Sequence, residues 1–191
     1  MIKIGILGNI GSGKSYISKQ FGYPVFNADK EVSKIYKKDK KCFNSLRKKI
    51  PNYIFSFPIK KKELKKLILE DKKNINIINK IVHPIVRAKM NKFFKKNINK
   101  KMVILDVPLL LENKLNIGNY ILVFVDAKKK QIIKRLKLRK NYNYLIFKKL
   151  NQLQLSLEKK RKKSNYIIKN DFKKNTVKKS VKIIINKILK R

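Results

Sequence analysis

The sequence predicts a three-layer α/β/α protein in which one five-stranded parallel sheet lies between two layers of helices. Two observations lead to this fold class. Short, largely apolar runs recur along the chain, as expected for parallel strands that are covered on both faces. Segments with helical spacing of apolar residues separate these runs, and such alternation favours a parallel sheet with right-handed crossovers. A chain of 191 residues is long enough for one such domain.

The N-terminal part of the chain is expected to form two strands, each followed by a helix. Residues 2–7 make the first strand, which ends at a glycine loop, and a helix follows over residues 13–21. A glycine and a proline then stop this helix, because both residues interrupt regular structure. Residues 25–29 form the second strand, which leads directly into a helix over residues 30–38.

Residues 41–100 contain no convincing strand and are expected to form an inserted block of short helices. Apolar residues recur there at helical spacing, and the prolines at positions 51, 58 and 84 should break the helices, because proline removes a backbone hydrogen bond. Apolar runs return after this block and again alternate with helical patterns. The remaining expected strands span residues 102–107, 120–126 and 166–170, and the remaining expected helices span residues 128–138, 145–163 and 176–190.

The composition indicates a soluble protein of the cytoplasm. One cysteine, Cys42, excludes an intramolecular disulfide and agrees with a reducing compartment. The apolar run at residues 2–7 is too short for the core of a signal peptide, and no run approaches the ~18 apolar residues of a membrane span. We therefore expect no membrane partner.

The formal net charge of +41 would ordinarily indicate a nucleic-acid partner. However, lysine supplies 46 of the 52 cations, and lysine, isoleucine and asparagine, all encoded by A/T-rich codons, are abundant throughout. A compositional drift explains such a uniform lysine coat without a specific nucleic acid, although a polyanion partner remains an alternative. Because the chain has only eleven acidic residues, each carboxylate in an apolar or loop setting is informative.

Residues 8–15 read GNIGSGKS and match the P-loop pattern G-x-x-x-x-G-K-[ST] between a predicted strand and a predicted helix. Glycines let backbone N–H groups turn toward phosphates, and the helix N-terminus adds its positive end. Lys14 can neutralise the terminal phosphates, and the Ser15 hydroxyl can bind Mg²⁺. The fold is therefore of the P-loop NTPase type. The expected nucleotide-binding residues are Gly8, Gly11, Ser12, Gly13, Lys14, Ser15 and Tyr16.

Two aspartates stand at the carboxyl ends of predicted strands, on the edge where open α/β sheets bind ligands. Asp106 can hold Mg²⁺ through a water, or it can be a turn residue beside Pro108. Asp29 follows a strand that is expected beside the P-loop strand, so it can face the γ-phosphate and accept a proton from an attacking hydroxyl. Alternatively, Asp29 is the N-cap of the helix expected from residue 30, and the two roles are compatible.

Three further residues are candidates because their types are rare in this chain. Arg135 and Arg139 lie at the end of one predicted helix and in the polar segment after it. An arginine there suits planar contact with a phosphate from a lid, but either residue can also be a solvated surface cation. His83, the single histidine, is either a structural residue or a substrate contact, and it has no companion ligand for a metal.

Several further motifs follow the P-loop in a specific order, and with them the chain resembles the dephospho-CoA kinase family over essentially its whole length. The resemblance implies transfer of the ATP γ-phosphate to the ribose 3′-hydroxyl of dephospho-CoA, the last step of coenzyme A synthesis, with Mg²⁺ as cofactor. The motifs are NADKEV at residues 27–32, VHPIVR at 82–87, DVPLLLEN at 106–113, Arg139, Gln154 with Glu158, and NYIIKN at 165–170.

The resemblance also implies a division of the chain into working parts. A core of residues 1–40, 101–138 and 164–191 carries an acceptor-binding insertion at 41–100 and a lid at 139–163, and Asn170 lies near the adenine of ATP. The catalytic candidates are Lys14, Asp29 and Arg139. The acceptor-binding candidates are Asp29, His83, Arg87, Pro108, Leu109 and Glu112, and the metal candidates are Ser15 and Asp106.

The sequence departs from the usual motifs of this family at a few positions. Asn27 stands in place of the first Asp of a D-A-D motif, Asn165 in place of an Asp, and Tyr144 in place of a frequent lid arginine; Leu7 and Asn9 replace a Thr and a Gly of the P-loop segment. One alternative function is another P-loop kinase, of the nucleoside monophosphate or shikimate type. A second alternative, suggested by the charge, is a nucleotide-gated nucleic-acid-binding protein.

Overall fold

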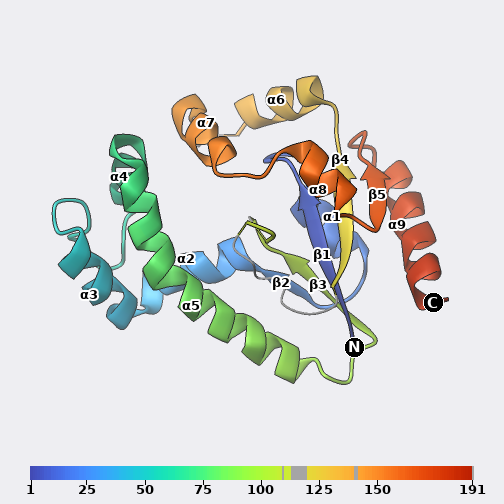
Figure 1. Cartoon of the computed structure of the whole chain (residues 1–191), viewed down its shortest axis with the longest axis horizontal. Helices are drawn as coiled ribbons and strands as arrows, with labels where there is room; N and C mark the ends of the chain where they lie inside the picture. The colour runs from blue at the N-terminus through green and yellow to red at the C-terminus, as the bar shows by residue number, and fades with distance from the viewer. Residues whose placement is uncertain (109, 113–119, 140–141, 191) are drawn as a thin grey trace.

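The computed structural model describes residues 1–108, 110–112, 120–139 and 142–190, and it confirms the predicted fold class. The five strands form one all-parallel sheet in the spatial order β2-β3-β1-β4-β5 (Figure 1). The strands are β1 Ile2–Gly8, β2 Val25–Asn27, β3 Met102–Asp106, β4 Tyr120–Asp126 and β5 Tyr166–Lys169. Since all strands run in parallel, their carboxyl ends meet at one edge of the sheet, where ligands bind in such folds.

Helices cover both faces of the sheet (Figure 1). In the described ranges, none of them is both long and apolar enough to cross a membrane. The helices are α1 Lys14–Gln20, α2 Ala28–Lys38, α3 Lys40–Lys49, α4 Lys61–Glu70, α5 Lys72–Lys96, α6 Lys129–Lys137, α7 Tyr144–Gln152, α8 Leu157–Lys162 and α9 Lys174–Leu189.

Two hydrophobic clusters lie on opposite faces of the sheet. Ile4 and Ile6 of β1 pack with Ile17 of α1 and with Val177 and Val181 of α9. The other cluster joins alternate strand residues to the helices α2 to α5, since successive strand side chains point to opposite faces. Its members include Leu7, Leu105, Phe124, Ile35, Cys42, Leu46, Leu67 and Val82. The inserted helices are therefore anchored to the same sheet that carries the P-loop.

The predicted break at Pro84 is wrong, because α5 continues through this proline from Lys72 to Lys96 (Figure 1). The buried residues of α5 recur on one face on both sides of Pro84, which is itself exposed. Packing of this continuous stripe outweighs the backbone hydrogen bond that proline removes. The buried residues of the stripe are Ile75, Ile78, Val82, Val86 and Met90.

The single long helix predicted over residues 145–163 is also wrong, because two helices, α7 and α8, replace it. The side chain of Ser156 accepts a hydrogen bond from the backbone N–H of Lys159 at 3.2 Å and thereby caps α8. Such an N-cap stabilises a new helix start and here separates the two segments.

Helix α7 contacts the end of α4 through the side chain of Lys149. Its Nζ donates to the carbonyl of Ile68 at 3.3 Å and also to the carbonyl of Leu69. Both carbonyls belong to the last turn of α4, where helix carbonyls have no partner within the helix and attract a positive charge.

Candidate active site

The P-loop connects the end of β1 to the start of α1. Gly11 and Gly13 have φ angles of 82° and 94°, a left-handed region that glycine adopts without strain. A Cβ atom on Gly13 would also lie 2.5 Å from Nδ2 of Asn170, so this position has no room for a side chain. Gly13 is the N-cap of α1 and forms no side-chain cap, which leaves the positive end of the helix directed at the cavity described below.

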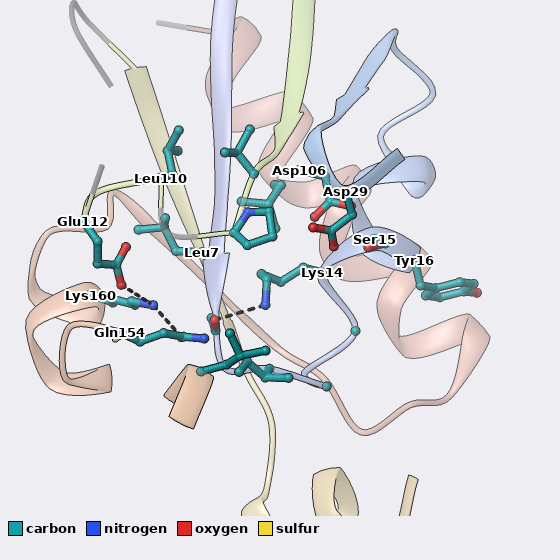
Figure 2. Close-up of a pocket in the computed structure, with 18 of the residues that line it drawn as sticks. Leu7, Lys14, Ser15, Tyr16, Asp29, Asp106, Leu110, Glu112, Gln154 and Lys160 are labelled. Carbon is teal, nitrogen blue, oxygen red and sulfur yellow. Dashed lines mark hydrogen bonds and ion pairs between the residues drawn. The ribbon is translucent and has the colours of Figure 1, made fainter. Parts of the chain in front are cut away.

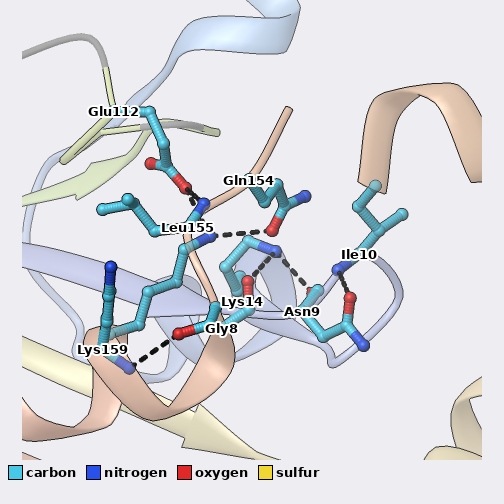
Figure 3. A network of polar contacts seen from close by, with 10 residues as sticks. Gly8, Asn9, Ile10, Lys14, Glu112, Gln154, Leu155 and Lys159 are labelled. Atoms are coloured by element: carbon cyan, nitrogen blue, oxygen red, sulfur yellow. Dashed lines mark hydrogen bonds and ion pairs between the residues drawn. The ribbon is translucent and has the colours of Figure 1, made fainter. Parts of the chain in front are cut away.

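Lys14 reaches back over its own loop. Its Nζ donates to the carbonyl of Asn9 at 2.7 Å and to the carbonyl of Gly8 at 3.2 Å (Figure 3). Burial lowers the pKa of Lys14 to about 8, partly opposed by the negative charges of Asp106 and Asp29. The ammonium is therefore held near the carboxylates but is charged in only part of the free protein at alkaline pH.

Asp29, in the first turn of α2, and Asp106, at the end of β3, share the opposite side of this region (Figure 2). Burial and the neighbouring Asp106 raise the pKa of Asp29, while Lys14 opposes the shift. The expectation that β2 lies beside the P-loop strand is wrong, because β3 lies between β2 and β1. Asp29 nevertheless reaches the same cavity, since β2 and β3 end side by side with Asn27 paired to Asp106.

The alternative role of Asp29 as an N-cap is also wrong. Asn27 is the N-cap of α2, and its Oδ1 accepts from the backbone N–H of Lys30 at 2.8 Å. The other side of the same amide, Nδ2, donates to Oδ2 of Asp106 at 2.5 Å. Asn27 thus performs the capping and also holds Asp106, while Asp29 lies in the first turn of α2 with its carboxylate free to face the cavity.

A cavity of about 450 Å³ brings most of the predicted residues together. It lies over the P-loop, between the carboxylates on one side and the turn that follows β3 on the other. Its lining includes the predicted residues Gly8, Gly11, Gly13, Lys14, Ser15, Tyr16, Asp29, Asp106, Pro108, Glu112, Arg135 and Arg139. Leu109, another predicted acceptor contact, lies outside the described residues.

Ser12 and Asn170 lie beneath the loop instead of on the cavity wall. Both are buried, and Nδ2 of Asn170 donates to the carbonyl of Ser12 at 2.7 Å. Oδ1 of Asn170 accepts from the backbone N–H of Phe172 at 2.9 Å, so the amide ties β5 to the P-loop backbone. The buried Oγ of Ser12 has no hydrogen-bond partner among the described residues.

His83 and Arg87 lie one helical turn apart on α5 and do not line the cavity. His83 is half-buried, whereas Arg87 is exposed. Burial lowers the pKa of His83, and the charge of Arg87 lowers it further, so the imidazole is held in its neutral form near pH 7.

Arg135 lies in the last turn of α6, and Arg139 follows the end of this helix. Arg139 lines both this cavity and a neighbouring one of about 480 Å³ between α4 and α7. The guanidinium carbon of Arg135 lies 4.5 Å from the centre of the Phe172 ring, which fixes that side chain by stacking.

One residue of the cavity wall was missed by the sequence analysis. Lys160 of α8 is buried, and its Nζ lies 2.8 Å from Oε1 of Glu112 and 2.8 Å from Oε1 of Gln154 (Figure 2). The sequence does not distinguish Lys160 from its neighbours, because it stands in a run of basic residues within a lysine-rich chain. The motif residues Gln154 and Glu158 flank this part of the chain, but the motif does not include Lys160.

The matching family model and the similar protein sequences belong to one family. A model of the family described as dephospho-CoA kinase matches residues 2–176. A dephospho-CoA kinase of Wolbachia pipientis wMel is 34% identical over 190 residues and covers 97% of each chain. A dephospho-CoA kinase of Bartonella henselae is 31% identical over 192 residues and covers 98% of each chain.

Two solved structures support the same fold. A crystal structure from Thermus thermophilus superposes with a TM-score of 0.80 at 24% identity and covers 97% of each chain. A dephospho-CoA kinase from Campylobacter jejuni has a TM-score of 0.62 at 22% identity, with 97% of this chain and 96% of that chain covered.

Proposed function

The chain belongs to the dephospho-CoA kinase family and catalyses the ATP-dependent final step of coenzyme A biosynthesis; on that premise we propose how its residues divide the work. The observation that supports this division is the meeting of Lys14, Asp29 and Asp106 at one cavity above the P-loop. A cation for the transferring phosphate and a carboxylate for the attacking hydroxyl are the two protein groups that this reaction requires.

Asp29 is the proposed general base. Its carboxylate accepts the proton of the ribose 3′-hydroxyl as the hydroxyl oxygen forms a bond to the γ-phosphorus of ATP. The bond between that phosphorus and the bridging oxygen to the β-phosphate breaks, and ADP leaves. The raised pKa of Asp29, which follows from burial and from Asp106, makes it a stronger base than an exposed aspartate.

Lys14 and the two arginines are the proposed counter-charges. On ATP binding, the Nζ of Lys14 exchanges the carbonyls of Gly8 and Asn9 for phosphate oxygens. Arg135 in α6 and Arg139 after its end both line the cavity. Arg139 is proposed to approach the phosphates when the segment of residues 139–163 acts as a lid, whereas Arg135 contributes its charge from the cavity wall, where it stacks on Phe172.

The residues present fit a bound Mg²⁺. Ser15 offers a hydroxyl and Asp106 a carboxylate at the same cavity, both of them the oxygen ligands that Mg²⁺ prefers. The described residues hold no cluster of three or more acidic, histidine or cysteine side chains for a metal, so phosphate and water oxygens would complete the coordination. Mg²⁺ would neutralise phosphate charge and orient the γ-phosphate, while Asn27 keeps Asp106 in place through its hydrogen bond.

The remaining assignments concern the two substrates. The insertion of residues 41–100, with His83 and Arg87, and the turn with Pro108, Leu109 and Glu112 form the proposed acceptor side. Asn170 holds the P-loop backbone and is proposed to border the adenine site. We place the enzyme in the cytoplasm and assign it no specific nucleic-acid partner.

The direct test is an assay with ATP, Mg²⁺ and dephospho-CoA, in which the product gains the mass of one phosphate. AMP, CMP and shikimate are offered as competing acceptors in parallel reactions. The proposal requires dephospho-CoA to be phosphorylated at the ribose 3′ position, and faster transfer to any competing acceptor would overturn it.

A further inference from the structure

Lys160 differs from the other lysines of its helix in where its side chain lies. It has 3% of its surface exposed, whereas Lys159 and Lys162 in α8 are exposed to solvent. Among the described side chains it is the one lysine that is buried in this sense. A lysine is almost never fully buried unless it is paired, so the position of Lys160 calls for a partner.

Glu112 is that partner, and it joins three segments of the chain. Its Oε1 lies 2.8 Å from the Nζ of Lys160 (Figure 2). The same oxygen accepts from the backbone N–H of Leu155 at 2.8 Å (Figure 3). The same Nζ donates to Oε1 of Gln154 at 2.8 Å. The turn after β3, the segment between α7 and α8, and α8 itself therefore meet at one buried carboxylate.

This arrangement leaves one carboxylate oxygen for another group. Oε2 of Glu112 is buried and has no hydrogen-bond partner among the described residues, while Glu112, Gln154 and Lys160 all line the cavity. Buried carboxylate oxygens without partners are costly, which indicates that a donor occupies this position in the working enzyme.

A buried ion pair such as Glu112–Lys160 does not by itself make a fold more stable. Replacing such a pair with apolar residues of similar volume is often neutral or stabilising, because desolvation offsets the attraction between the charges. The network of Glu112, Gln154 and Lys160 therefore suits the fixing of geometry better than the general strengthening of the fold.

We infer that Lys160 is a positioning residue for the acceptor substrate, a role that rests on the function proposed above. By holding Oε1 of Glu112, Lys160 directs Oε2 toward a hydroxyl or amide N–H donor of dephospho-CoA. Through Gln154 and Leu155 it also fixes the end of the lid segment to the acceptor-side turn. Lys160 touches Glu112 and Gln154, and it acts on the acceptor through them.

The test compares Lys160→Met with Lys159→Met, an exposed neighbour in the same helix. Steady-state kinetics with dephospho-CoA and ATP are measured for both variants, together with ATP binding by calorimetry. We expect Lys160→Met to lower kcat/KM for dephospho-CoA by ~10-fold or more, since small misplacements of a substrate can cost up to ~10²-fold. ATP affinity should stay within about twofold of the parent, and Lys159→Met should behave as the parent.

Glu112→Gln and the double variant Glu112→Gln/Lys160→Met complete the experiment. If the two residues act as one unit, the double variant loses little more than either single variant, because effects within a unit are not additive. The double variant also avoids an unpaired buried charge, so its kinetics can still be measured if Lys160→Met folds poorly.

Each outcome decides the inference. The inference is overturned if Lys160→Met weakens ATP affinity as much as it lowers kcat/KM for dephospho-CoA. It is also overturned if the losses in kcat/KM of the two single variants add up in the double variant, or if Lys160→Met behaves like Lys159→Met. If neither Lys160 variant folds well enough to bind ATP, Lys160 is a residue of the fold and the inference is likewise wrong. A parent enzyme that does not phosphorylate dephospho-CoA would instead reject the proposed function, which separates the two failures.

Discussion

At the scale of single residues, the two aspartates of the site differ in their hydrogen bonds. Asp106 is held by the amide of Asn27, whereas Asp29 keeps its carboxylate directed at the cavity near Lys14. One carboxylate is therefore fixed by a donor, as suits a residue that helps to place a metal. The other is free to take a proton, as suits a base.

Replacing Asp29 with asparagine tests its role as a base. Because Asn27 already caps α2, the Asp29→Asn variant should fold and melt like the parent and retain ATP binding. Loss of general-base help should lower kcat by ~10²-fold, within the range of ~10²–10⁴-fold typical of this type of catalysis. Thermal melting, ATP calorimetry and steady-state kinetics measure the three quantities. An early-melting variant with normal turnover would make Asp29 a structural residue.

The pH dependence of ATP binding tests the charge of Lys14. Burial lowers the pKa of the free Lys14 to about 8, so the ammonium is present below that pH and is lost above it. Phosphates favour the charged form, and ATP affinity should therefore fall by up to ~10-fold per pH unit above about pH 8. Calorimetry from pH 7 to 9.5 measures this slope.

Lys14→Met is the control for this pH dependence. This variant should bind ATP weakly. Its ATP affinity should show no change of slope against pH near pH 8, because the titrating ammonium is absent. An unchanged slope in this variant would assign the titration to another residue.

At the scale of secondary-structure elements, local pattern predicted most of the fold but not every boundary. The strands and the P-loop were recognisable because each apolar run or glycine pattern is complete within a few residues. The continuity of α5 through Pro84 depends on a buried stripe that forms only when the helix packs on the sheet. The place of β3 between β1 and β2 likewise depends on the tertiary structure and has no local signal.

Replacing Pro84 with alanine tests the cost of a proline inside α5. Alanine restores a backbone donor and removes the ring that crowds the preceding turn, so the free energy of unfolding should rise, by up to ~3 kcal/mol. Urea denaturation measures the change. Pro51→Ala, outside the helices, is the control and should be neutral or slightly destabilising. A less stable Pro84→Ala variant would show that the helix requires the proline geometry.

The residues of the candidate site could be predicted from the sequence where they belong to a recognisable motif. The P-loop, Asp29, Asp106, Glu112 and Arg139 stand in recognisable patterns, and the structure places all of them on one cavity. Lys160 could not be recognised, because a buried lysine and a solvated lysine look alike in a chain with 46 of them. Its distinguishing property is burial beside Glu112, which arises only when α8 packs against the turn that follows β3.

At the scale of the whole molecule, positive charge dominates the surface. Several of the eleven acidic residues are drawn to the interior or the cavity, including Asp29, Glu63, Asp106 and Glu112. Few carboxylates therefore remain to balance the surface lysines. Such a field attracts polyanions in general, including ATP, and is screened by salt.

Binding to random duplex DNA tests whether this charge has a specific partner. A compositional lysine coat should bind DNA weakly at ~0.15 M salt, with a steep salt dependence that follows counterion release and with no effect of sequence. Fluorescence anisotropy with two unrelated duplexes over a salt series measures this binding, and ATP should change it only by competition. Nanomolar, sequence-selective binding at that salt concentration would restore the nucleic-acid alternative.

The contact of Lys149 with the end of α4 has a mechanical consequence. Helix α7, in the segment that we propose as a lid, is joined to α4 by Lys149, whose Nζ donates to the carbonyls of Ile68 and Leu69. A motion that swings α7 away from the cavity must either break this fastening or carry α4 with it as one rigid body. In the second case the hinge lies outside both helices, and a lid motion of α7 would also shift the helices that we propose to form the acceptor side.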